Sequence, residues 1–396
     1  MAVFDPAAAT SAYLATLSSA AQAKAVAYTQ GGHWLLLWGW LVTVAESVLI
    51  LKSGGLLRLV RGLERTRPRP LLAAFVASVV FLVADWVLEL PWASYADWWR
   101  ERQYGMTSQA WSGWLTDQAI LFGASLPVLA LLFVALYALV RRATRSWPLW
   151  TGAICGAFVV FGAWASPAVL EPMLNHYTPA PPGPVRDLVV TLGDSVGVPT
   201  DKIYVYNGSK QSNRYTANVA GLFGTARVAL SDTMFKQGAD LAEVRGIVGH
   251  EMGHYVLHHI LWGALFQAVM AALVAFGVML LFPFVRGWLG AGDLGGVADP
   301  AGLPIAYLIV ASLSLIATPI FNTQTRMHEA AADTFSLEHA HEPDGLAKAL
   351  VKTIAYRAAS PSDLEEFIFY DHPSVEHRIR KAMDWKAAHP NAVPQG

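Results

Sequence analysis

Two histidines four residues apart, with a glutamate directly after the first, form the pattern in this chain that is best suited to chemistry. The five residues are His250-Glu251-Met252-Gly253-His254. On a helix, positions four apart lie on one face, so both imidazoles can bind a single Zn²⁺. Glu251 lies one position further round, where it can hold a metal-bound water instead of the metal. The pattern is typical of a metalloprotease, and the alternative is a pair of solvated histidines on a helix surface.

The residues before this pattern predict the helix that it needs. Asp240 followed by Glu243 resembles a capping box, in which each side chain bonds the backbone N–H of the other residue. Apolar residues then recur at helical spacing up to His250. They are Leu241, Val244, Ile247 and Val248. We therefore expect the metal-binding pattern to lie on an α-helix.

A catalytic zinc typically binds three protein ligands and leaves its fourth position to water, so a third ligand must lie elsewhere. The strongest candidate is Glu329, 79 residues after His250, in an alanine-rich segment that predicts a helix. Asp333 would lie on the same face of that helix. A carboxylate in such a place can accept a hydrogen bond from a metal-binding imidazole and fix its orientation. The alternative for this pair is a solvated acidic face.

The composition indicates that much of the chain lies in a lipid bilayer. Hydrophobic residues make up 54% of the 396 residues and charged residues only 14%, against about a quarter charged in an ordinary soluble domain. Six apolar runs each have close to the roughly 20 residues that cross the hydrocarbon layer. They lie at about 34–51, 71–92, 119–140, 147–170, 259–284 and 303–321. We expect about six transmembrane helices, with buried helices of a large soluble core as the alternative.

Tryptophans and acidic residues add detail to these runs. Tryptophans cluster where the runs end, which suits rings at the level of the lipid headgroups, although core packing would also explain each of them. They are Trp34, Trp38, Trp92, Trp98, Trp99, Trp147 and Trp150.

Three acidic residues lie inside the runs, where acidic groups usually face a polar interior: Glu46, Asp85 and Glu89. They predict a water-accessible cavity among the helices, unless Asp85 and Glu89 reach headgroup water at a helix end.

Charge and cysteine content argue against several other classes of protein. The net charge is −1 at pH 7 and no basic stripe or aromatic-interleaved patch occurs, which argues against nucleic acid as a partner. Cys155 is the only cysteine, so neither an intrachain disulfide nor a thiolate metal cluster can form. The N-terminus has no basic residue before Lys24 and therefore does not resemble a cleavable signal peptide.

Shifts in composition divide the chain into five parts. They are an N-terminal segment (1–33), four transmembrane helices (34–178), a soluble part ending with the metal-binding helix (179–258), two more transmembrane helices (259–321) and a C-terminal part with the third ligand (322–396). The first soluble part should hold a helix at 185–195 and short strands at 202–206, 215–220 and 226–230. Because the soluble parts flank a pair of membrane helices, the metal site should lie close to lipid.

These features together resemble the type-I CAAX prenyl endopeptidases, a family of integral-membrane zinc peptidases that cut isoprenylated C-terminal tails. The likeness extends from about residue 35 to residue 385. Glu329, Ala332 and Asp333 match the family's Glu-x-x-Ala-Asp pattern, and His372-Pro373 with Arg378 matches its His-Pro-x-x-x-x-Arg stretch. Further matches are Leu90-Pro91-Trp92, Tyr177-Thr178-Pro179, Gly208-Ser209-Lys210, Ala217-Asn218, Gly221, Arg227 and Ser231-Asp232-Thr233.

The resemblance implies a mainly α fold, in which an integral-membrane bundle of about six helices encloses a cavity. A gluzincin-type zinc peptidase unit with a small β-sheet would be joined to this bundle. One Zn²⁺ per chain, held by His250, His254 and Glu329, would polarise the scissile carbonyl and lower the pKa of a bound water. Glu251 would take the proton of that water and later pass it to the leaving amine.

The resemblance also implies roles around the zinc. His372 would stabilise the oxyanion, although it could instead only cap the helix after it. Arg378 would anchor the same segment or bind a substrate carboxylate. A substrate peptide would pair with the edge of the strand at 215–220. The expected substrate-binding residues are Thr216, Ala217, Asn218 and Gly221.

The chain departs from the family in two places. The family often continues Asn-Ala-Tyr where this chain has Asn218-Val219-Ala220. Members with seven spans carry an extra N-terminal membrane helix that we do not find in this sequence. Three further histidines near the expected ligands, His258, His259 and His328, are better explained as surface or orienting residues than as ligands.

Two other functions fit the same residues. The bacterial heat-shock membrane zinc protease, which degrades misfolded membrane proteins, shares the metal pattern on a smaller scaffold. A non-catalytic membrane receptor or transporter with a structural zinc would need a fourth protein ligand. We expect a monomer in the bacterial inner membrane, whose partners are the lipid bilayer and a peptide or protein substrate, prenylated or not.

Two signals disagree on the orientation of the chain in the membrane. Lys and Arg crowd the 52–70 connection and the Arg141-Arg142 turn, which the positive-inside rule places in the cytoplasm. An even number of spans then leaves the zinc site outside. The family resemblance implies instead that the site opens to the cytosol.

Overall fold

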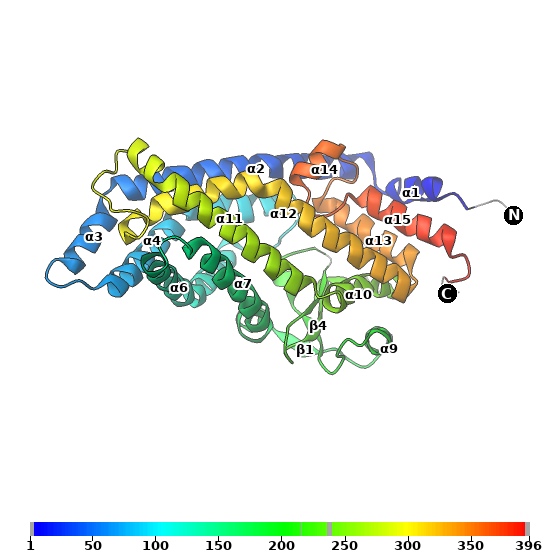
Figure 1. The fold of residues 1–396 in the computed structure, drawn as a ribbon. Helices are drawn as coiled ribbons and strands as arrows, with labels where there is room; N and C mark the ends of the chain where they lie inside the picture. The colour runs from blue at the N-terminus through cyan, green and yellow to red at the C-terminus, as the bar shows by residue number, and fades with distance from the viewer. Residues whose placement is uncertain (1–3, 215, 236–239, 393–396) are drawn as a thin grey trace.

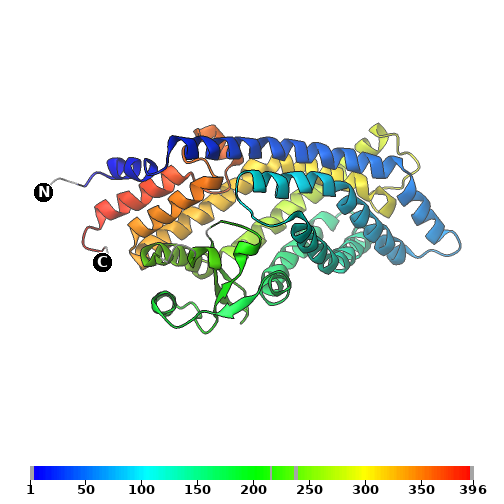
Figure 2. The same cartoon turned by 180° about the vertical axis from the view of Figure 1, so that it is seen from behind.

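The computed structural model describes residues 4–214, 216–235 and 240–392 of the chain. The molecule is elongated, and its long helices run roughly along its length (Figure 1). The first helix, α1 (Pro6–Leu14), packs against the last, α15 (Val375–Ala388), at one end. Helix α3 (Gly55–Glu64) lies at the opposite end. Seen from behind, helix α2 (Ser19–Lys52) runs along most of the distance between the two ends (Figure 2).

Six helices among the described residues are long and apolar enough to cross a membrane, which confirms the predicted number. They are α2 (Ser19–Lys52), α4 (Pro70–Ala93), α6 (Trp111–Arg142), α7 (Trp147–Ala165), α11 (His259–Trp288) and α12 (Leu303–Ala340). Short π-helical turns and the helices α5 (Arg100–Gln103) and α8 (Glu171–Leu174) extend α4 and α7. Each predicted apolar run lies inside one of these helices or its extension, and the helices continue past the runs with more polar residues.

Small residues let α7 and α11 pack closely. A Cβ atom at Gly152 would lie 2.3 Å from the carbonyl oxygen of Ala268, and one at Gly156 would lie 2.8 Å from the Cβ of Ala268. The two glycines are four residues apart and therefore share a face of α7, a spacing that membrane helices use for close approach. This contact holds α11, which comes after the metal-binding helix in the chain, against the membrane bundle.

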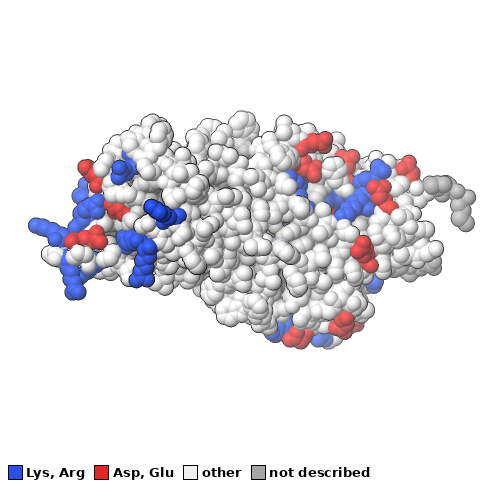
Figure 3. Space-filling model, in the orientation of Figure 1, with Lys and Arg blue, Asp and Glu red and all other residues white. Residues whose placement is uncertain are grey.

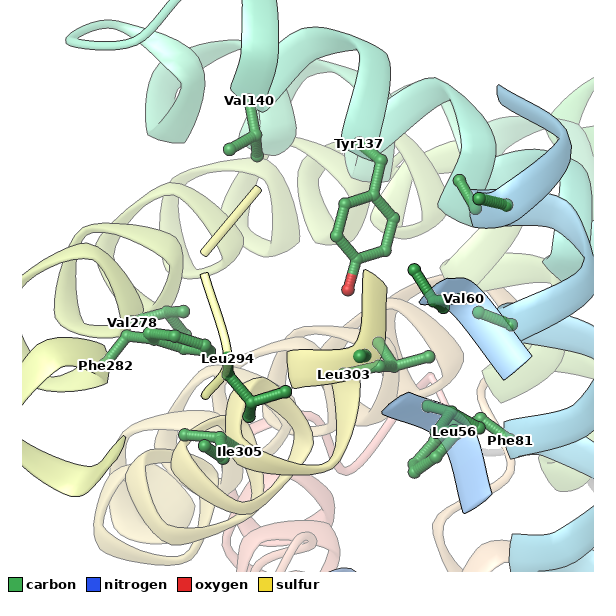
Figure 4. Close-up of a cluster of buried hydrophobic side chains, with 14 of the residues drawn as sticks. Leu56, Val60, Phe81, Tyr137, Val140, Val278, Phe282, Leu294, Leu303 and Ile305 are labelled. Carbon is green, nitrogen blue, oxygen red and sulfur yellow. The ribbon is translucent and has the colours of Figure 1, made fainter. Parts of the chain in front are cut away.

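Buried apolar side chains form a core at the end of the bundle that carries α3 (Figure 4). They come from α3, α4, α6, α11, α12 and the connection before α12. The labelled side chains are Leu56, Val60, Phe81, Tyr137, Val140, Val278, Phe282, Leu294, Leu303 and Ile305. This core fixes α3 across the end of the bundle.

The interior of the bundle differs in part from the prediction. A cavity of about 400 Å³ with mostly apolar walls lies among α6, α7, α11 and α12. Glu46, Asp85 and Glu89 do not line it, and Glu46 is only 6% exposed, so this cavity is not the water-accessible one expected around them. Trp147 is also buried and packs in the core, whereas Trp150 is 56% exposed, as a residue at headgroup level should be.

A small sheet lies beside the metal-binding helix. Its strands are β1 (Tyr177–Pro179), β2 (Ile203–Tyr206), β3 (Ala217–Ala220) and β4 (Arg227–Ser231), in the order β1-β2-β4-β3. The β2–β4 pair is parallel, and the other two pairs are antiparallel. The predicted strands at 202–206 and 226–230 are confirmed to within a residue, and residue 215 of the third lies outside the described residues. The three residues of β1 were not predicted, because so short a strand shows no alternation.

Helices complete the part of the molecule that holds the metal-binding pattern. They are α9 (Pro184–Val196), as predicted at 185–195, then α10 (Leu241–Val256), α13 (Pro343–Thr353), α14 (Asp363–Phe369) and α15. Helix α12 continues from the membrane bundle into this part without a break, so residues 321 and 322, expected at a boundary, lie within one helix. Its C-terminal half packs against α10 (Figure 1).

Candidate metal centre

Helix α10 begins as the sequence predicts, with one difference. The side chain of Asp240 accepts hydrogen bonds from the backbone N–H groups of Ala242 at 2.9 Å and Glu243 at 3.4 Å, which caps the helix. Glu243, expected to complete a capping box, instead forms an ion pair with Lys352 of α13. The reason is that α13 packs against the first turns of α10 and brings this ammonium group to the carboxylate.

The structure brings His250, His254 and Glu329 together from α10 and α12. The Nε2 atoms of the two histidines are 3.1 Å apart. Glu329 places Oε2 3.2 Å from Nε2 of His250 and Oε1 3.3 Å from Nε2 of His254. The three side chains are drawn together although 75 residues separate His254 from Glu329 in the chain. The donor atoms therefore form a nearly regular triangle.

This triangle fits a metal ion. In a tetrahedral zinc site with bonds of about 2.0–2.1 Å, two ligand atoms lie roughly 3.3–3.4 Å apart, close to the three distances observed. Two imidazole nitrogens that face each other cannot both carry a proton without repulsion. Oε2 of Glu329 is buried and makes no well-formed hydrogen bond to any described residue. A cation between the three side chains would satisfy all of these groups.

Asp333 and Arg378 support the His250 corner of the triangle. Oδ1 of Asp333 lies 2.9 Å from Nδ1 of His250, so an N–H on Nδ1 leaves Nε2 free to face the metal. The guanidinium of Arg378 donates two hydrogen bonds of 2.7 Å to the same carboxylate. Asp333 is 2% exposed and Arg378 is 6% exposed. Arg378 thus anchors Asp333 through two hydrogen bonds, and it also lines the cavity beside the ligands, so its expected role as a partner of a substrate carboxylate stays a prediction.

A second group of side chains supports His254. Its Nδ1 lies 2.9 Å from Nδ1 of His259, the first residue of α11. The ring of His259 stacks on that of His328, with centroids 4.2 Å apart and planes 5° from parallel. Gln324 lies 3.0 Å from Nδ1 of His328. His259 thus contacts the ligand His254 and His328 packs on His259, and neither belongs to the group of His250, His254 and Glu329. The exposed His258 has a left-handed backbone, with φ 55°.

Glu251 faces the same space as the triangle. A cavity of about 180 Å³ lies here, and Glu251, His250 and Glu329 are in its wall. Burial raises the pKa of Glu251, and the nearby imidazoles of His250 and His254 oppose this effect. A carboxylate whose pKa is raised in this way is suited to taking and releasing a proton.

His372 reaches the cavity from the segment between α14 and α15. Its Nε2 lies 3.3 Å from Oε2 of Glu329, and its Nδ1 lies 2.9 Å from Oδ1 of Asp371. Burial lowers the pKa of His372. Ser374, not His372, caps α15, because its hydroxyl accepts a hydrogen bond from the N–H of His377. The structure therefore gives His372 a place beside the metal ligands in addition to its place before a helix.

The expected substrate-binding residues separate into two pairs. Thr216 and Ala217 line the cavity, and β3 has no strand partner on its outer edge among the described residues. Asn218 and Gly221 do not line it. Gly221 has φ 110°, and a Cβ atom there would lie 2.4 Å from the carbonyl oxygen of Thr225, so a glycine is needed for the turn into β4.

One wall of the cavity is not indicated by any motif in the sequence. That wall comes from α13 and the turn after it: Leu346, Ala349, Leu350, Thr353, Tyr356 and Arg357. Arg357 is mostly buried. Its guanidinium forms an ion pair with the exposed Asp371, in which Nη2 of Arg357 and Oδ1 of Asp371 are 3.6 Å apart. The packing of α13 on α10, and of the turn after α13 on α2, brings these residues to the metal ligands.

Comparisons with known proteins agree with this geometry. Residues 179–386 match the sequence model of peptidase family M48, and residues 7–176 match that of the CAAX prenyl protease N-terminal region, described as five membrane helices. Four of the six long apolar helices of the described chain lie within residues 7–176. Both regions of the chain thus resemble one type of membrane protease.

Individual relatives cover most of the chain. An uncharacterised metalloprotease of Bacillus subtilis, YhfN, is 28% identical over 78% of this chain and 72% of its own length. A CAAX prenyl protease 1 homologue of Arabidopsis thaliana is 25% identical over the same shares. The crystal structure of S. mikatae Ste24p has the same fold, with a TM-score of 0.75 and 18% identity over 93% of this chain and 90% of that one.

Proposed function

Because the chain belongs to peptidase family M48 and is a multi-pass membrane metalloprotease, we propose that it is a zinc endopeptidase that hydrolyses peptide bonds at the membrane surface. The observation that carries the proposal is the triangle of His250, His254 and Glu329 with Glu251 in the wall of the same cavity. Three protein ligands leave the fourth corner of a tetrahedral site open, as catalysis requires. A structural zinc would have a fourth protein ligand, which argues against a non-catalytic receptor.

In the proposed hydrolysis, each residue around the metal has its own role. A zinc ion held by the three ligands would supply a Lewis acid and a water of lowered pKa. Glu251 takes a proton from the attacking water and returns it to the leaving amine. His372, 3.3 Å from Glu329, lies where an N–H can stabilise the oxygen of the scissile carbonyl. Asp333 holds His250 in orientation, and Arg378 holds Asp333.

The free edge of β3 is the proposed site for the substrate backbone. An extended peptide that pairs with Ala217 and its neighbours would cross the cavity beside His250 and Glu251. Such pairing recognises the backbone, so it tolerates many sequences. Thr216 and Ala217 line the cavity and Asn218 does not, which makes Thr216 and Ala217 the residues that contact the substrate.

The cavity also favours a substrate with a negative charge beyond the cleaved bond. Arg357 lines it with only a distant carboxylate partner, which leaves its guanidinium able to bind an anion. The relatives named CAAX prenyl proteases suggest a C-terminal tail, prenylated or not, whose free carboxylate would be that anion. We place the chain in the cell membrane of a bacterium, as a monomer.

Metal replacement and peptide cleavage test this function. The purified chain, stripped with a chelator and reloaded with Zn²⁺, should cleave a prenylated tail peptide and lose that activity when the metal is removed. The same peptide without its prenyl group measures the contribution of the lipid. Cleavage of an unfolded membrane protein, with neither tail peptide cut, would favour the quality-control function instead, and cleavage of none of the three would reject the endopeptidase.

A further inference from the structure

We propose that the end of the molecule that carries α3 lies in the cytoplasmic leaflet, where it binds anionic lipid headgroups, so that the metal site opens on the opposite face of the membrane. We call this region the basic end. It comprises the connections 53–69, 143–146 and 289–299 and the helix ends beside them. The proposed orientation does not depend on the proposed hydrolysis. The inference about which side of the membrane the substrates come from rests on that proposed function.

Charge is distributed unequally along the molecule. The basic end holds ten basic residues and only three acidic ones, Glu64, Asp293 and Asp299. The basic residues are Lys52, Arg58, Arg61, Arg65, Arg67, Arg69, Arg141, Arg142, Arg145 and Arg286. The rest of the chain has 18 basic and 26 acidic residues. Figure 3 shows the basic side chains gathered at one end of the molecule, beyond a broad middle with few charges.

Part of this positive charge is used within the protein. Arg61 forms an ion pair of 2.8 Å with Asp299, the most buried acidic residue of the basic end. Arg141 donates to the carbonyl oxygens of Pro70 and Ala298, and Arg286 donates to those of Leu294 and Gly295. These bonds tie the three connections together into one surface.

The remaining arginines face outward. Among the described residues, no ion pair is formed by six exposed arginines of the basic end: Arg58, Arg65, Arg67, Arg69, Arg142 and Arg145. Arg58 lies on α3, which is held in place because its Leu56 and Val60 are buried in the core of the bundle. A surface of exposed guanidinium groups that form no ion pair with a described carboxylate is complementary to a layer of anionic headgroups.

Aromatic residues place this surface at the depth of the headgroups. Trp288 at the end of α11 is 76% exposed, and Trp150 in the first turn of α7 is 56% exposed. Trp262, in the first turn of α11, is 60% exposed. The 26 helical steps from Trp262 to Trp288 span about 39 Å, close to the thickness of a bilayer with its headgroups. The basic end therefore lies at one interface and the metal site at or beyond the other.

Short basic connections stay in the cytoplasm during insertion, and the cytoplasmic leaflet carries the negative surface potential. All three connections of the basic end are short. At the other end the basic residues beside the membrane helices are fewer: Lys24 precedes the first apolar run, and Arg100 and Arg102 stand next to Asp97 and Glu101, before a connection at 104–110 that has no basic residue. The charges and the fold thus assign the metal site to the outer face. The substrates of the proposed endopeptidase would then be exported or outward-facing peptide segments.

Cysteine labelling in intact cells tests the orientation. In a Cys155→Ser background, Thr66→Cys marks the basic end and Asn391→Cys marks the opposite end, both at exposed positions. A membrane-impermeant maleimide should label Asn391→Cys in intact cells and Thr66→Cys only after permeabilisation. The reverse pattern, or labelling of both in intact cells, overturns the proposal. The readout is independent of hydrolysis, so failure of the proposed function would leave it unchanged.

Lipid binding tests the headgroup contact on purified full-length protein in neutral detergent. Phosphatidylglycerol should raise the thermal midpoint by several degrees, while phosphatidylcholine or inorganic phosphate at the same concentration should not. Replacing three outward arginines by glutamine should remove at least half of the rise, and a matched triple variant at the other end should keep it. The first variant changes Arg65, Arg67 and Arg69, and the control changes Lys24, Arg186 and Arg380. An undiminished rise in the first variant would rule out the contact.

Discussion

At the scale of single residues, the arrangement of buried charges decides what the metal centre can bind. Glu329 and Asp333 lie on successive turns of α12 and are 7% and 2% exposed. Arg378 neutralises Asp333 through two hydrogen bonds and remains 3.6 Å from Glu329. Glu329 therefore directs a negative charge at two imidazoles, and a buried anion needs a nearby cation. A metal ion bound between these side chains would supply that cation and would tie the stability of this region to metal binding.

Glu251→Gln should abolish hydrolysis and leave the metal in place. Glutamine keeps the size of the side chain but cannot take a proton, and a general base typically contributes about 10²–10⁴-fold to the rate. We expect kcat to fall by at least about 100-fold with an unchanged ratio of metal to protein by atomic absorption. Near-normal turnover in this variant would remove Glu251 from its proposed role.

Asp333→Asn should weaken metal binding. The amide cannot neutralise Arg378 or accept from His250 as strongly, and partners of metal ligands commonly contribute about 10–100-fold to affinity. Competition with a metal chelator measures this change directly, without reference to activity. Glu338→Gln, an exposed change on the same helix, is the control and should bind metal normally. Equal affinities in the two variants would show that Asp333 does not orient its histidine.

Arg357→Gln should affect only substrates with a free C-terminal carboxylate. A hydrogen bond to a charged group contributes about 1.5–3 kcal/mol, which corresponds to roughly 10–150-fold in kcat/KM. The variant should lose that factor with a free-acid tail peptide and show little change with its C-terminal amide. Arg357→Lys should restore part of the preference. A variant that cleaves both peptides equally poorly would indicate a structural role for this arginine.

At the scale of helices and strands, apolar length and local pattern explain what could be predicted. The six membrane helices follow from their apolar runs, and α10 follows from Asp240 and the apolar spacing after it. The metal ligands belong to motifs, so their chemistry is visible before the fold is known. Arg357 and Tyr356 belong to none, because their position depends on α13 packing against α10 and on the turn after α13 packing against α2. Packing contacts between distant helices produce no local sequence pattern from which they could be predicted.

Gly152→Ala should destabilise the packing of α7 on α11. The added methyl would meet the carbonyl oxygen of Ala268 at 2.3 Å, and overpacking of this kind typically costs about 1–3 kcal/mol. Gly162→Ala on the same helix is the matched control, because a Cβ there meets nothing within 4 Å. The first variant should lower the thermal midpoint in detergent and the second should not. Equal midpoints would mean that the two helices separate easily.

At the scale of the whole molecule, two differently built parts share one long helix. The membrane bundle is held by apolar packing, and the part with α10 and the sheet has its own apolar core. Helix α12 belongs to both, since its first half lies in the bundle and its second half carries Glu329. A metal ion between α10 and α12 therefore joins the second part to the helix that enters the membrane.

Removal of the metal should loosen the part with α10 before the membrane bundle. A ligand that binds only the folded state at 100 times its Kd adds about 2.7 kcal/mol of stability, and the chelated protein loses that contribution. Limited proteolysis after chelation should first cut between residues 175 and 258, while the α7–α11 contact stays protected. The His254→Ala variant should already show this pattern without a chelator and should not respond to one. If chelation leaves the wild-type cleavage pattern unchanged, the metal does not join the two parts.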